Sequence, residues 1–100
     1  MTIELNKTYT LKLTNADELV CKIINETPTG YTVENPLSAV PTEKGIQLIF
    51  TVFTGDPKET ATINKSAVAM ICATREEVSD SYLEMTTGIK PVRKSQILMS

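Results

Sequence analysis

The feature that most constrains this chain is a hydrophobic period of two along most of its length. Apolar and polar side chains alternate between Tyr9 and Leu13, for example, and tight-turn residues interrupt the alternation at intervals. Alternation of this kind predicts strands with one buried face. It predicts five strands, over residues 9–13, 18–25, 31–35, 46–54 and 59–72, the last with a pause at 64–65. Because bare edges on such a sheet invite aggregation, we expect a strongly bent antiparallel sheet that closes into a small barrel.

The period changes after the last strand. Thr74 and Glu77 have the spacing of a helix capping box, and Gly88 is a natural residue to end a helix. Between them lies one apolar stripe at helical spacing, formed by Val78, Tyr82 and Met85. The pattern predicts a helix over about residues 75–87. The expected fold class is therefore all-β, with a five-stranded barrel and a C-terminal helix in one domain over residues 1–90 and a mobile tail over 91–100.

Composition argues against catalysis. The chain has no histidine and two cysteines, Cys21 and Cys72, so no nucleophile has a visible activating base and no metal-ligand spacing is present. We therefore expect no enzyme activity, no cofactor and no metal. Both cysteines lie in apolar runs, which predicts that both are buried and reduced. No apolar run approaches the ~20 residues that span a bilayer, so we expect a cytoplasmic protein without membrane contact.

The predicted strand at 46–54 is apolar on both faces. One face carries Ile46, Leu48, Phe50 and Val52, and the other carries Gln47, Ile49, Thr51 and Phe53. A strand that turns one face to water would not show this pattern. Two interpretations stay open: a neighbouring copy covers Ile49 and Phe53, or the predicted helix lies over them.

Two stretches and the order of the predicted elements resemble the Sm-like family, which includes the Sm, LSm and bacterial host-factor proteins. Residues 13–23 (LTNADELVCKI) are similar to the family's first motif, with Ala16 and Cys21 where the family usually has glycine. Residues 63–71 (INKSAVAMI) are similar to its second motif, with Asn64-Lys65 in place of Arg-Gly. A helix after the barrel that ends in Met-Thr-Thr-Gly, at 85–88, resembles Sm-like proteins of tailed phages.

The resemblance implies a homo-oligomeric ring in which the fourth strand of one subunit pairs with the fifth of the next. The implied interface residues are Ile49, Phe53, Val68 and Met70. It also implies that the ring is a binding scaffold for single-stranded RNA, with contacts from Asn64, Lys65 and the ring of Tyr31. The net charge of −2 lacks the basic excess typical of nucleic-acid binders. An alternative function is therefore a structural or assembly accessory ring that binds other proteins.

Overall fold

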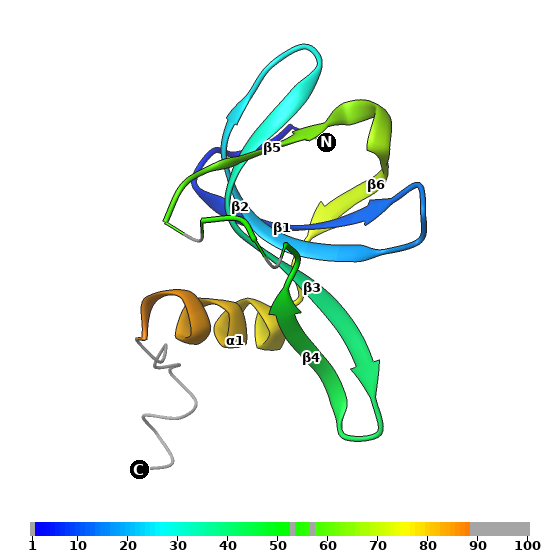
Figure 1. The fold of residues 1–100 in the computed structure, drawn as a ribbon, viewed down its shortest axis with the longest axis vertical. Helices are drawn as coiled ribbons and strands as arrows, with labels where there is room; N and C mark the ends of the chain where they lie inside the picture. The colour runs from blue at the N-terminus through cyan, green and yellow to red at the C-terminus, as the bar shows by residue number, and fades with distance from the viewer. Residues whose placement is uncertain (1, 53, 57, 89–100) are drawn as a thin grey trace.

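The computed structural model describes residues 2–52, 54–56 and 58–88, and these form a strongly bent antiparallel sheet with one helix (Figure 1). The strands are β1 (Lys7–Leu13), β2 (Glu18–Glu26), β3 (Gly30–Thr42), β4 (Gly45–Phe50), β5 (Ala61–Asn64) and β6 (Val68–Ala73). A short 3₁₀ turn, η1 (Lys65–Ala67), joins β5 to β6, and the helix is α1 (Glu76–Thr87). The predicted all-β class with a C-terminal helix is confirmed.

The sheet curls around β3, which is long enough to pair with three other strands. Its order is β4-β3-β2-β1-β6, and β5 pairs with the first part of β3. The predicted fifth strand is therefore two strands with different partners, since β5 pairs with β3 and β6 pairs with β1. The turn η1 lies between them, at the pause that the sequence shows, and it carries the chain from one side of the barrel to the other (Figure 1).

The bend in β3 occurs at Asn35 and Pro36. Asn35 has a positive φ of 49°, a left-handed conformation that asparagine tolerates better than most residues. The β2–β3 register shifts at this point, between the Leu37–Val20 and Glu34–Lys22 pairs, so Pro36 lies where its missing N–H does not break a regular ladder. The strand predicted to stop at residue 35 instead continues to Thr42. Its first part pairs with β5 and its last part with β4.

The same proline explains why β4 ends at Phe50 rather than at the predicted residue 54. The last β3–β4 pair is Leu37 with Phe50, so the next residue opposite Thr51 is Pro36, which has no N–H to donate. The Thr51 hydroxyl donates instead to the Pro36 carbonyl oxygen at 3.0 Å. The chain then leaves the sheet before β5 begins at Ala61.

The barrel interior is one apolar cluster. It consists of Tyr9, Leu11, Leu19, Cys21, Ile23, Tyr31 and Val33. Burial raises the pKa of the Cys21 thiol to about 12, so this group is a protonated core thiol at neutral pH. The prediction that both cysteines are buried is wrong for Cys72, which is exposed on β6. Among the described residues β6 pairs with β1 alone, which leaves its other edge without a partner strand.

The helix α1 covers the outer face of the sheet beside the bend. Tyr82 is 2% exposed and packs with Val20 and Leu37, and half-buried Val78 and Leu48 extend this second cluster. The Tyr82 hydroxyl donates to the Glu34 carbonyl oxygen at 2.8 Å, just before the bend in β3. Val78 and Tyr82 of the predicted stripe therefore form the docking face of the helix, whereas Met85, its third member, is 54% exposed.

The predicted capping box is wrong, although the predicted helix end is right. Arg75 is the N-cap residue and makes no side-chain capping bond. The Thr74 hydroxyl lies 3.0 Å from the Thr10 hydroxyl, so a contact with β1 takes the group that was expected to cap the helix. At the other end Gly88 adopts a left-handed φ of 76°, and its N–H donates to the Glu84 carbonyl oxygen.

Ala16 gives a stability prediction at the turn between β1 and β2. Its φ is +75°, in the left-handed region that costs an L-residue with a Cβ roughly 1 kcal/mol or more. Asn15 braces the turn by accepting the Asp17 N–H at 3.0 Å. We expect Ala16→Gly to raise the free energy of unfolding by up to about 1 kcal/mol, measured by urea denaturation. An unchanged or lower value would contradict the strain at this position.

Candidate functional site

The three residues implied as RNA contacts meet at one corner of the barrel, where β3 begins and β5 ends. Gly30 pairs with Asn64 and Tyr31 with Ile63 in the β3–β5 ladder. The Lys65 backbone N–H donates to the Thr29 carbonyl oxygen at 2.8 Å, which fixes η1 against the β2–β3 turn. The sheet thus brings Tyr31, Asn64 and Lys65 together, although 33 positions separate Tyr31 from Asn64 along the chain.

Lys65 is already paired within the subunit. Its Nζ donates to the Glu26 carboxylate at 2.6 Å and lies 5.2 Å from the centroid of the Tyr31 ring. About a third of each charged side chain remains exposed, 32% for Lys65 and 37% for Glu26. A phosphate that approached Lys65 would therefore have to compete with a carboxylate in a solvated contact. Such a contact is worth little on its own.

Tyr31 offers little surface for stacking. The residue is 8% exposed and belongs to the barrel core, with the Lys65 ammonium group over its ring. Stacking of a base needs an open ring face. Asn64, in contrast, is exposed and makes no side-chain capping bond at the start of η1. Of the three, Asn64 is the side chain most accessible to a ligand.

The second candidate surface is the pair of strands at the ends of the sheet. β4 and β6 terminate the order β4-β3-β2-β1-β6, so each has a neighbouring strand on one side in the described part of the chain. Both carry exposed apolar side chains: Met70 on β6 is 63% exposed, and Ile49 on β4 is 46% exposed. Val68 is half-buried and packs against the barrel core. Phe53, the fourth implied interface residue, lies outside the described residues.

The position of α1 tests one of the two interpretations of β4, that the helix lies over Ile49. The helix packs near Leu48, which alternates with Ile49 and therefore points to the opposite face. Ile49 instead lines a hollow of ≈ 560 Å³ between the β3–β4 hairpin and the β1–β2 turn, together with Lys12, Asp17 and Glu18 among others. The helix does not cover Ile49, so the second apolar face of β4 is open in the single subunit.

No protein-family model matches the chain, and no curated protein matches it. Two further findings bear on function. No three histidine, cysteine, aspartate or glutamate side chains gather closely enough to hold a metal ion among the described residues. Over the same residues, no helix has the length and apolar character to cross a membrane.

Glu26 is the site residue that the sequence did not reveal. It lies 39 positions from Lys65, at the end of β2, and nothing in the local pattern of either segment marks the pair. Only the β3–β5 register brings η1 next to the β2–β3 turn. The one available signal was an acidic residue, Glu26, shortly before the suspected RNA contact Tyr31 in the sequence. That Glu26 binds Lys65 could be inferred only once the strand pairing was known.

Proposed function

We propose that this protein is a homo-oligomeric, Sm-like binding scaffold in which β4 of one subunit pairs with β6 of the next. The observation that carries the proposal is that the two end strands of one sheet are both apolar and open. Strand edges that have no partner among the described residues, with Met70 and Ile49 exposed on them, are a ready template for pairing with another chain. Charged side chains on an edge strand discourage such pairing. Neither β4 nor β6 carries a charged residue.

Contact between β4 and β6 is head-to-tail, because each subunit uses a different surface toward each neighbour. Repeated contacts of this kind form a ring when the rotation closes, and an open filament when it does not. The barrel bends sharply between the two edges, so successive subunits are rotated relative to each other (Figure 1). Light scattering behind a sizing column tests assembly. A mass of several subunits is expected, and a mass of one subunit at every concentration would exclude the scaffold.

RNA is the ligand that the Sm-like resemblance implies, and the Glu26–Lys65 pair gives it a specific test. Removing the Glu26 charge frees the Lys65 ammonium group for a phosphate, so Glu26→Gln is expected to tighten binding of short U-rich RNA at low salt. Lys65→Ala and Asn64→Ala are expected to weaken it. Fluorescence anisotropy titrations measure all three, with U-rich and A-rich RNA compared.

Glu43→Gln is the matched control for that test. Glu43 lies in the exposed β3–β4 turn, and its substitution changes the net charge by the same amount away from the barrel corner. A gain in affinity that appears equally in Glu43→Gln would reflect overall charge and not this corner. Absence of binding at low salt, where phosphate contacts are strongest, would reject RNA as the ligand.

A protein ligand is the second candidate, and the same corner favours it. Lys65 is held by a carboxylate, Tyr31 is buried, and the chain is acidic overall. These properties weaken contacts to a polyanion but do not hinder contacts to a protein surface. An assembled ring that binds no RNA in the titrations would support this accessory role.

A further inference from the structure

A groove lies between the end of α1 and the segment that joins β4 to β5. It is formed by two adjoining hollows of ≈ 150 and ≈ 220 Å³, which share Asn35 and Phe50. We call it the helix–loop groove and define it by Asn35, Phe50, Val52, Asp56, Glu59 and Met85. It lies away from the barrel corner that holds Lys65.

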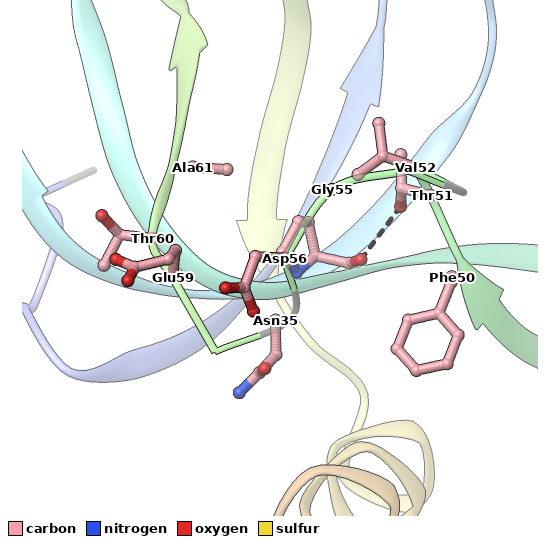
Figure 2. A pocket seen from close by; sticks show the side chains of 10 residues that line it. Asn35, Phe50, Thr51, Val52, Gly55, Asp56, Glu59, Thr60 and Ala61 are labelled. Atoms are coloured by element: carbon pink, nitrogen blue, oxygen red, sulfur yellow. Dashed lines mark hydrogen bonds between the residues drawn. The ribbon is translucent and has the colours of Figure 1, made fainter.

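The groove has an apolar floor and an acidic end. Phe50, Val52 and Met85 are 61%, 58% and 54% exposed, which is unusual for side chains of this size on one surface. Asp56 and Glu59 line the end farther from the helix, and Figure 2 shows their carboxylates on the opposite side of the hollow from the Phe50 ring. Of the described lining residues, these two are acidic and none is basic.

The matching chemistry is present in this chain, in residues 89–100. This segment follows Gly88 directly, and Met85 and Thr86 form the helix end of the groove, so the segment starts beside it. Its sequence, IKPVRKSQILMS, combines basic and apolar side chains. The basic residues are Lys90, Arg93 and Lys94, and the apolar ones include Ile89, Val92, Ile97 and Leu98. Residues 89–100, including the predicted mobile tail, lie outside the described residues.

We propose that the helix–loop groove binds residues 89–100 of the same chain, with apolar side chains over Phe50, Val52 and Met85 and basic side chains beside Asp56 and Glu59. Burial of apolar surface supplies attraction, and the opposite charges fix the direction of the segment along the groove. Because the segment is tethered next to the groove, its effective concentration is high, and modest contacts suffice to hold it.

A nitroxide spin label on residue 95 tests this contact in the full-length chain. The label is attached through Ser95→Cys in a Cys72→Ser background, since Cys72 is exposed whereas Cys21 is buried with a raised thiol pKa. Methyl spectra give the readout, because they remain usable in a large assembly. Val52 and Met85 methyl signals are expected to lose intensity, while the signals of Leu5, which is 49% exposed outside the groove and on neither end strand, are not.

Two comparisons make the result specific. The double variant Asp56→Asn, Glu59→Gln is expected to restore part of the lost intensity. Addition of 1 M salt, at which the Debye length falls to ~3 Å, is expected to do the same. Glu43→Gln is the matched control and is expected to change nothing. The absence of a selective loss at Val52 and Met85 would overturn the proposal. Losses that stay the same when Asp56 and Glu59 are neutralised would overturn it as well.

Mixing distinguishes the possible occupants. A spin-labelled chain without isotope is mixed with an isotope-labelled chain without spin label. The proposal expects no loss of intensity in this mixture, because each segment occupies its own groove. Losses that persist in the mixture would assign the segment to a second copy and overturn binding within the chain. Assembly through β4 and β6 is measured separately, so either proposal can fail alone.

Discussion

Met70→Lys is expected to convert the assembled protein into single subunits. Met70 is 63% exposed on the end strand β6, where an added ammonium group would have to be buried against the β4 edge of the neighbour. Burial of an unpaired charge costs several kcal/mol, more than a short strand contact can offset. Ile49→Lys on β4 is expected to have the same effect from the other side of the contact. Light scattering behind a sizing column measures both masses.

Mixing the two variants gives the sharpest result. A subunit with Ile49→Lys retains an intact β6, and one with Met70→Lys retains an intact β4, so one good contact can form between them. The equimolar mixture is expected to give a mass of two subunits, although each variant alone gives one. An isologous contact between two β4 strands would instead leave Met70→Lys assembled, and that outcome would contradict head-to-tail pairing.

Leu5→Lys is the control for both variants. Leu5 is 49% exposed, comparable with Ile49, but it precedes β1 and lies on neither end strand. The substitution adds the same side chain to an exposed apolar position. It is expected to leave the mass of the assembly unchanged, and disassembly by this variant would mean that any added charge disrupts the protein.

The sequence was informative wherever local pattern and tertiary structure agree. Alternation predicted the strands, because one face of each had to enter a core, and Gly88 predicted the helix end, because few other residues accept its left-handed conformation. The capping prediction failed since the Thr74 hydroxyl pairs with Thr10, which is 64 positions away. The predicted end of β4 at residue 54 was wrong for a similar reason, because Pro36 on another strand ends the pairing at Phe50.

The candidate sites were likewise predictable from the sequence only where local pattern was enough. Residues 63–71 indicated Asn64 and Lys65 through a motif resemblance, which needs only sequence. That Lys65 is held by Glu26, and that Tyr31 is a core residue beneath it, follow from the β3–β5 pairing. Which face of β4 stays open also required the fold, since alternation shows that two faces are apolar but not which one α1 covers.

Tyr82→Ala is expected to lower the free energy of unfolding by about 3–5 kcal/mol, the range for large buried aromatic side chains cut to alanine. Tyr82 is 2% exposed and is the largest member of the cluster that attaches α1 to the sheet, with Val20 and Leu37 beneath it. Urea denaturation followed by circular dichroism measures the change. A loss below about 1 kcal/mol would mean that α1 contributes little to the stability of the barrel.

Tyr82→Phe separates packing from hydrogen bonding at the same position. It keeps the ring but removes the hydroxyl that donates to the Glu34 carbonyl oxygen, so a loss of about 1 kcal/mol is expected. Burial also raises the pKa of the Tyr82 hydroxyl, so the folded state favours its neutral form. The stability from this group is therefore complete below the ordinary tyrosine pKa of about 10 and is lost as the pH rises above it. In Tyr82→Phe that part of the alkaline loss is expected to disappear. An unchanged alkaline profile in this variant would assign the loss to other groups, of which the buried Cys21 thiol is one.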